Sequence, residues 1–367
     1  MPAAYWGTAL SSPALPLALS APHAYDLALE RVIFRGGNFV RAMVLGLLGC
    51  FVACLIASLA GVAPLQAEPY PDRPITIMVP FGKGTTAELV AVVVAEAMSK
   101  NVGQKVTVEL KPGAGGGIAM AQVEKAAPDG YTLAMITQGT HVFNLSLYKT
   151  LLYDPEKITP ITPIAAVSNV MTVHPSNPAN TPLEVAAAAS AAPGQLTYAS
   201  GGVGTSHHLG GVLFASIAGV DIKHVPHLVS VDGVNKIVRG EITMGFFNLP
   251  TVIEDIKAGR LKALAVTSPG RSPHLPDVPT LDASGLKGYD LVTWFGFGAP
   301  AGTPSATLQR LRDEFASAAA DPTVKAKLNQ AGLDPIDQMQ PSDFARLIAS
   351  DLARWTPVIK GAGASAE

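Results

Sequence analysis

The stretch ITIMVPFGKGTTAELVAVVVAEAMSKNVGQKVTVEL, residues 75–110, decides the fold class of this chain. Its two ends are short β-branched runs at 75–80 and 105–110, and its middle, 87–100, is rich in alanine and valine. Strand, helix, strand at this spacing is typical of a right-handed βαβ unit, in which a helix covers two parallel strands. The stretch therefore predicts an α/β fold.

The same alternation continues in two blocks, separated and followed by long apolar stretches at 158–175 and 289–302. Each apolar stretch is long enough to run between two lobes, and the tail after it has a helical period. We therefore predict two α/β lobes joined by two crossing strands. Lobe 1 would comprise 68–168 plus 292–367, and lobe 2 would comprise 169–291.

The N-terminal 67 residues differ in composition from the rest. They contain arginines but no lysine, and an apolar run from 42 to 67 ends in a small residue. This order predicts an N-terminal extension and a signal peptide cleaved after Ala67, and hence a periplasmic protein. An uncleaved membrane anchor or a lipid attached at Cys50 is the alternative. Residues 1 to about 30 fit none of these roles, so we expect translation to start downstream.

Charge and cysteine content exclude two classes of function. The net charge is −2, and no long run of lysine or arginine is present, which argues against a nucleic-acid partner. Both cysteines, Cys50 and Cys54, lie in the apolar N-terminal run. The exported part therefore has no disulfide framework and no cysteine nucleophile.

The loop VPFGKGTTAE, residues 79–88, resembles a phosphate loop at first sight. A P-loop has four residues between its first glycine and a Gly-Lys-Ser/Thr sequence, and that spacing is absent here. Thr85 followed by Glu88 is a capping-box pattern, so a helix begins at this point. Its free N–H groups suit a small anion such as a carboxylate, with a plain strand-to-helix turn as the alternative. We expect Lys83 to be solvated.

Three other patterns lack the spacing of a catalytic or metal site. The glycines at 113–117 do not form a dinucleotide fingerprint, and no glycine follows Ser206 as a hydrolase elbow requires. The adjacent His207 and His208 would point about 100° apart on a helix, without a spaced acidic partner. We therefore predict no catalytic residue, no cofactor and no metal.

Several motifs together resemble the solute receptors of tripartite tricarboxylate transporters, the Bug family of periplasmic binding proteins. The motifs cover residues 68–364 in consistent order and include YPDRPITIMVPF, KPGAGGGIAMAQVEKAAPDGYTL, LTYASGG and WFGFGAPAGTP. The resemblance implies a type II periplasmic-binding-protein fold. It also implies a monomer that captures a small carboxylate between its lobes and delivers it to the permease subunits of a tripartite transporter.

The family's motifs place the expected ligand-binding residues in five segments. These are the loop after the first strand, the loop after the third strand, the hydroxyl-rich helix start of lobe 2, and the segments around residues 227 and 247. The implied ligand-binding residues are Phe81, Gly82, Gly84, Thr85, Thr86, Gln138, Gly139, Thr140, Gly204, Thr205, Ser206, His227, Phe247 and Asn248.

The sequence departs from the family's pattern at three of these positions. Thr85 replaces a glycine, Phe247 replaces an aspartate, and His227 followed by Leu228 replaces Tyr-Lys. These changes predict a less polar wall in lobe 2, which would favour an aromatic or alkyl monocarboxylate. An exported hydrolase using Ser206, or a sensor-partner protein on the same fold, is the alternative function.

Overall fold

The computed structural model describes residues 43–48, 70–336 and 339–366 of the 367-residue chain. The chain divides into two compact units, Met1–Glu68 and Pro69–Glu367. In the first unit, residues 43–48 are helical, and the predicted cleavage after Ala67 lies outside the described residues. None of the described helices has both the length and the apolar character that a membrane span requires.

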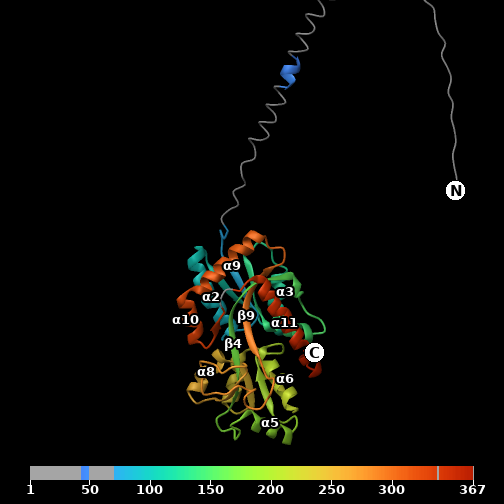
Figure 1. Cartoon of the computed structure of the whole chain (residues 1–367), viewed down its shortest axis with the longest axis vertical. Coiled ribbons are helices and arrows are strands. Elements are labelled where there is room, and N and C mark those ends of the chain that lie inside the picture. Colours follow the sequence, from blue (N-terminus) through green and yellow to red (C-terminus); the bar gives the residue numbers. More distant parts are fainter. Residues whose placement is uncertain (1–42, 49–69, 337–338, 367) are drawn as a thin grey trace, which may run out of the picture. The chain divides into compact units, whose positions relative to one another are not determined.

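Ten strands of the second unit form one continuous sheet, with β4 running through its centre (Figure 1). Their order is β2-β1-β3-β9-β4-β7-β5-β6, and both β8 and β10 also pair with β4. The strands are β1 (Ile75–Val79), β2 (Val106–Leu110), β3 (Thr132–Thr137), β4 (Ile158–Val173), β5 (Thr197–Ser200), β6 (Lys223–Pro226), β7 (Met244–Asn248), β8 (Lys262–Val266), β9 (Val292–Pro300) and β10 (Asp334–Pro335).

Strand β4 changes partner along its length and so divides the sheet into two halves. From Ile158 to Ser168 it pairs antiparallel with β9, and from Asn169 to Val173 it pairs antiparallel with β7. We call the part built on β1, β2, β3, β9 and β10 the first half, and the part built on β5 to β8 the second half. Within each half the pairs that follow from βαβ units, such as β1 with β2 and β5 with β6, are parallel. The predicted α/β fold, with a long strand passing between two α/β blocks, is confirmed.

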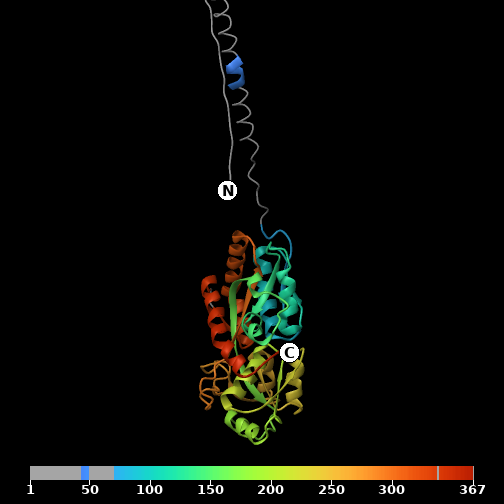
Figure 2. The same ribbon diagram turned by 90° about the vertical axis from the view of Figure 1, so that its right-hand side faces the viewer.

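Helices cover both faces of the sheet in each half (Figure 2). The α-helices are α2 (Thr86–Val102), α3 (Gly117–Glu124), α4 (Asn144–Leu147), α5 (Pro182–Ala191), α6 (Ser206–Ala218), α7 (Ser230–Val238), α8 (Leu249–Lys257), α9 (Ser305–Ala320), α10 (Pro322–Gln330) and α11 (Pro341–Gly361). Short 3₁₀ turns lie at Ala114–Gly116 and Pro155–Lys157, and a π-helical turn, η2 (Gly139–Phe143), continues into α4.

The predicted capping box opens α2. The Thr85 hydroxyl accepts from the N–H of Glu88 at 3.3 Å, and the Glu88 carboxylate accepts from the N–H of Gly84 at 2.5 Å. The helix ends at Gly103, which has a left-handed φ of 69° that favours glycine. Between these ends the apolar face of α2 is buried against the sheet. The helix, and with it the loop that precedes it, is therefore fixed on the sheet.

The C-terminal helix α11 packs on the first half. Trp355 is buried and meets Phe143 edge to face, with 4.9 Å between the ring centroids. The buried carboxylate of Asp351 accepts hydrogen bonds from Gln138 Nε2 and Trp294 Nε1, both at 2.8 Å. A buried carboxylate requires such donors, so these two bonds tie the helix to β9 and to the start of η2.

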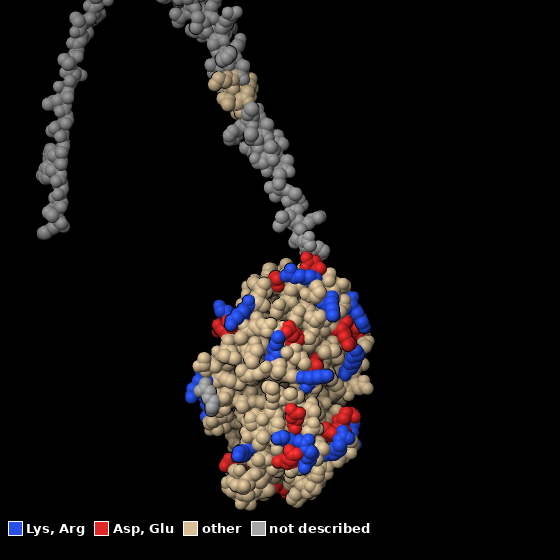
Figure 3. Space-filling view, turned by 180° about the vertical axis from the view of Figure 1, so that it is seen from behind, with Lys and Arg blue, Asp and Glu red and all other residues tan. Residues whose placement is uncertain are grey.

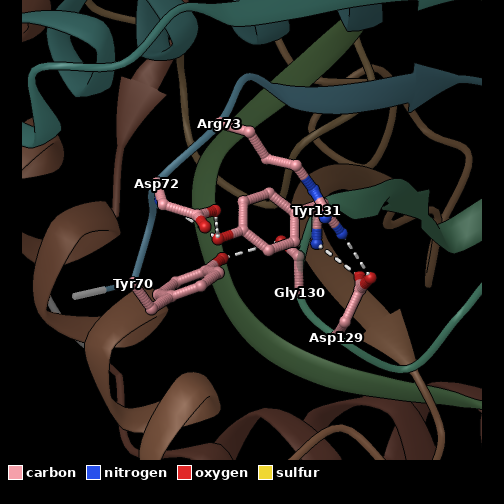
Figure 4. A network of polar contacts seen from close by, with 6 residues as sticks. All are labelled: Tyr70, Asp72, Arg73, Asp129, Gly130 and Tyr131. Atoms are coloured by element: carbon pink, nitrogen blue, oxygen red, sulfur yellow. Dashed lines mark hydrogen bonds and ion pairs between the residues drawn. The ribbon is translucent and has the colours of Figure 1, made fainter. Parts of the chain in front are cut away.

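A polar network anchors the chain before β1 (Figure 4). The Tyr70 hydroxyl donates to the carbonyl of Gly130 at 2.7 Å, and the Tyr131 hydroxyl donates to Asp72. Arg73 lies over the Tyr131 ring at 4.0 Å and forms an ion pair with Asp129 at 2.8 Å. The network joins the start of the second unit to the turn before β3.

Candidate ligand-binding cavity

A cavity lies where the two halves meet, at the carboxyl ends of β3 and β7. Its empty space, counted together with its opening to solvent, is about 410 Å³. None of the described residues that line it carries an ionised side chain. They are Phe81, Thr85, Thr86, Ala87, Thr137, Gly139, Thr205, Ser206, His207, Ser230, Asn248, Thr293 and Phe295.

Four α-helices begin at this cavity. Thr86 is the first residue of α2, Ser206 of α6 and Ser230 of α7, and Asn248 is the N-cap of α8. The first N–H groups of a helix have no acceptor within it, and the helix dipole makes this end positive. A cavity without cationic side chains can therefore still hold an anion.

The wall from the first half presents a free hydroxyl. Thr86 is 3% exposed, and its buried Oγ1 has no hydrogen-bond partner among the residues that the structure describes. The N–H groups of Thr86 and Ala87 lie in the first turn of α2, where no intrahelical acceptor is available. Lys83 is exposed to solvent, as expected, and does not line the cavity. The polar groups available here are thus neutral donors.

The wall from the second half contains a neutral histidine. Burial lowers the pKa of His207 to about 4, although a hydrogen bond from its side chain to Asn248 opposes this shift. The distance from His207 Nε2 to Asn248 Oδ1 is 3.0 Å. The imidazole is therefore uncharged near neutral pH and adds no positive charge to the cavity.

The structure brings together seven of the fourteen residues implied by the family motifs. These seven line the cavity: Phe81, Thr85, Thr86, Gly139, Thr205, Ser206 and Asn248. The other seven lie near the cavity but do not line it, and each takes part in a contact within the protein. They are Gly82, Gly84, Gln138, Thr140, Gly204, His227 and Phe247.

Two of these seven residues use their polar side chains inside the first half. The Gln138 amide donates to Asp351 at 2.8 Å. The Thr140 hydroxyl lies 3.2 Å from the carbonyl of Thr137 and 3.0 Å from His141 Nδ1. The loop predicted after the third strand is in fact the helical turn η2, which directs these side chains away from the cavity.

The residues expected to make the wall of the second half less polar do not line this cavity. Phe247 is fully buried beneath the wall and packs against Gly245, while Leu228 is 69% exposed on the surface. His227 lies beside Gly233, and its buried Nδ1 has no hydrogen-bond partner within the described part of the chain. The wall itself consists of Thr205, Ser206, His207, Ser230 and Asn248. Alternation along β7 turns Phe247 away from the cavity and Asn248 toward it.

Glycines allow the two halves to approach closely beside the cavity. A Cβ added at Gly139 would lie 2.7 Å from the carbonyl oxygen of Gly204 in the other half. A Cβ at Gly204, which has a φ of 83°, would lie 2.1 Å from Asn144 Oδ1. Side chains at either position would collide, so this contact depends on glycine.

A second contact between the halves is apolar. Val229 and Val231, at the start of α7, face Gly82 and Gly84 of the loop that precedes α2. Added Cβ atoms at these glycines would lie 3.6 Å and 3.2 Å from the valine methyl groups. Gly82 therefore has room for a methyl group, and Gly139 has none.

Six lining residues were not among the fourteen. Thr293 and Phe295 project from β9, Thr137 ends β3, and Ala87, His207 and Ser230 lie in first helical turns. The helix starts could have been found from the sequence, because each predicted helix has a first turn. The β9 residues could not, because which side chains of β9 face the cavity depends on its register with β3 and β4.

Comparison with known proteins identifies the family. Residues 90–364 match the model of the tripartite tricarboxylate transporter family receptor. The chain belongs to this receptor family. Family membership implies an extracytoplasmic location, and the family consists of solute receptors.

Named relatives resemble the receptor over most of their length. Protein BugT of Bordetella pertussis is 31% identical over 324 residues, which are 88% of this chain and 98% of BugT. The structure of Rpa4515 from R. palustris with adipate has a TM-score of 0.77 and 33% identity, covering 81% of this chain and 99% of that one. MatC from Rhodopseudomonas palustris with bound malate has a TM-score of 0.75 and 29% identity, covering 79% and 100%. The receptor therefore has a periplasmic-binding-protein fold.

Proposed function

We propose that the receptor captures a small carboxylate between its two halves and delivers it to the permease subunits of a tripartite transporter. One observation carries this proposal. Four α-helices begin at a cavity whose described lining has no ionised side chain, so the cavity favours an anion through neutral donors. The bound adipate and malate of the two similar structures support the same class of ligand.

The fourteen motif residues remain candidates for the site, together with the six lining residues added above. We assign direct contact with the ligand to the residues that line the cavity, and a supporting role to those behind it. Hydrogen bonds from such neutral donors each contribute on the order of 1 kcal/mol net. The site requires no metal, no cofactor and no catalytic residue in this mechanism.

Binding would close the two halves over the ligand. The lobes would be 68–168 plus 292–367 and 169–291, because β4 changes from β9 to β7 between Ser168 and Asn169. A ligand held by both walls stabilises the closed form more than the open one, and this difference drives closure.

Export and partners complete the proposal. A signal peptide cleaved after Ala67 would release the receptor into the periplasm as a monomer, and N-terminal sequencing of the exported protein tests the cleavage site. Positive and negative side chains are interspersed on the face in Figure 3, a distribution that does not favour nucleic acid. Binding and release of a solute require no turnover, so the receptor would not be an enzyme.

Calorimetry with the exported part of the chain tests the function. The titrants would be adipate, malate, citrate, hexanoate and benzoate, with the uncharged adipamide as the control. We expect saturable binding of at least one carboxylate and none of adipamide. Binding of adipamide alone, or of no titrant, would refute the proposal.

A further inference from the structure

We infer that Asn169 positions the hydroxyl of Ser206 as a donor into the cavity. The ligand group held at Ser206 is then a hydrogen-bond acceptor. This inference rests on the proposed function and extends it to a residue that neither lines the cavity nor belongs to the fourteen candidates. Asn169 is a positioning residue, because it would act on the ligand only through Ser206.

Asn169 lies at the point where β4 passes from the first half to the second. It is the first residue of β4 that pairs with β7, directly opposite Asn248, and it is 0% exposed. Its N–H donates to Thr267 Oγ1 at 2.8 Å, and its carbonyl accepts from the N–H of Thr267 at 2.9 Å. Pairing with β7 on one side and with Thr267 on the other therefore fixes the backbone position from which the Asn169 side chain projects.

A backbone donor fixes which atom donates and which accepts in the first hydrogen bond of this chain. The N–H of Gly201 lies 3.2 Å from His207 Nδ1, so Nδ1 accepts and the proton of the neutral ring is on Nε2. Nε2–H then donates to Asn248 Oδ1 at 3.0 Å. This bond assigns the oxygen of the Asn248 amide and leaves its nitrogen to donate.

The chain continues to a backbone acceptor. Asn248 Nδ2 donates to Asn169 Oδ1 at 2.7 Å, and Asn169 Nδ2 donates to the carbonyl of Phe246 at 2.8 Å. A backbone N–H can only donate and a backbone carbonyl can only accept. The two ends therefore fix the direction of every bond between them.

Both amides direct their remaining proton at Ser206. The distances to Ser206 Oγ are 3.2 Å from Asn169 Nδ2 and 3.4 Å from Asn248 Nδ2. A hydroxyl has two lone pairs and one proton, so both lone pairs are engaged and the proton has to point elsewhere. Within the described part of the chain, both hydrogen bonds of this hydroxyl are ones that it accepts.

Ser206 lines the cavity, which provides the open direction for its proton. A carboxylate oxygen accepts such a bond, and an ammonium group, which has only donors, cannot. The network thus favours a bound group that accepts a hydrogen bond, and it does so without a charged side chain in the cavity. It also adds a donor beside the N-terminus of α6.

The first test needs no ligand. Nitrogen NMR of the ¹⁵N-labelled exported part at pH 7 reports the tautomer of His207, and a His207→Gln variant assigns its signals. We expect the proton on Nε2. A proton on Nδ1 would reverse the chain of bonds and overturn the inference.

The second test compares two probes of equal length in the wild-type receptor. Adipate has an acceptor at each end, and 1,6-diaminohexane has an ammonium group at each end. We expect adipate to bind at least about 5-fold more tightly, since an unsatisfied buried donor costs about 1 to 3 kcal/mol. Equal affinity for the two probes would overturn the inference.

A double-mutant cycle then separates positioning from a general structural role. We expect Ser206→Ala and Asn169→Leu each to weaken adipate binding about 10-fold. The double variant should be no more than about twofold weaker than Ser206→Ala, because Asn169 acts through that hydroxyl. If the loss of affinity in the double variant equals the product of the two single losses, the inference is overturned. If no carboxylate binds the wild-type receptor, the proposed function fails, and the tautomer of His207 alone decides the network.

Discussion

Replacing Gly139 by alanine should prevent the two halves from closing. The added methyl group would lie 2.7 Å from the carbonyl oxygen of Gly204, which belongs to the backbone of the other half and cannot rotate away. Gly139 does not have a positive φ, so alanine is compatible with its own backbone conformation. The substitution therefore opposes closure without straining the half in which it lies.

The size of the effect follows from this clash. Overpacking by a single methylene usually costs about 1 to 3 kcal/mol. We take the described form, in which Gly139 lies against Gly204, as the closed form. An open form without this contact avoids the clash, so the cost weakens ligand binding by about 5- to 150-fold. The free energy of unfolding without ligand should change by less than about 0.5 kcal/mol.

Calorimetric titration with adipate or malate, whichever binds the wild type more tightly, measures the change in affinity. Gly82→Ala is the matched control, because its methyl group would lie 3.6 Å from Val229 Cγ2, an ordinary contact across the same boundary. We expect the control to bind within about twofold of the wild type. Wild-type affinity in Gly139→Ala would refute the role of this contact in closure.

Three further changes test the site and the fold. Thr86→Val keeps the shape of the side chain but removes its free hydroxyl, so calorimetry should show carboxylate binding weakened about 5-fold, with unchanged stability; unaltered affinity would exclude a contact with the ligand. Thr85→Ala removes the N-cap of α2 and should lower the free energy of unfolding in urea by about 1 kcal/mol. Burial lowers the pKa of His141 to about 4. As the pH falls below 6.5, the His141 side chain therefore takes up a proton in the unfolded chain but not yet in the folded protein, and the free energy of unfolding decreases as the pH falls from 6.5 towards 4. In urea unfolding at pH 6 and pH 5, His141→Gln should reduce that pH dependence by about 1 kcal/mol per pH unit, and an unchanged slope would contradict this.

The sequence predicted the elements of this fold well, because their causes are local. The capping pattern of Thr85 and Glu88 marked the start of α2, and the β-branched runs marked the parallel strands. The turn η2 was missed, since nothing in Gly139–Phe143 distinguishes a π-helical turn from a loop. Gln138 was assigned to the ligand because its buried partner, Asp351, is 213 residues away.

The fold class, the family motifs and the glycine- and threonine-rich starts of the helices follow from local sequence. These properties depend on neighbouring residues, whose spacing is read directly along the chain. The side chains that face the cavity, in contrast, depend on tertiary contacts. Alternation along β7 buried Phe247 and turned Asn248 inward, and the change of partner in β4 placed Asn169 behind Ser206. Such contacts join residues far apart in the sequence, such as Asn169 and Asn248, which are 79 positions apart. Their geometry arises from strand register, which no local pattern encodes.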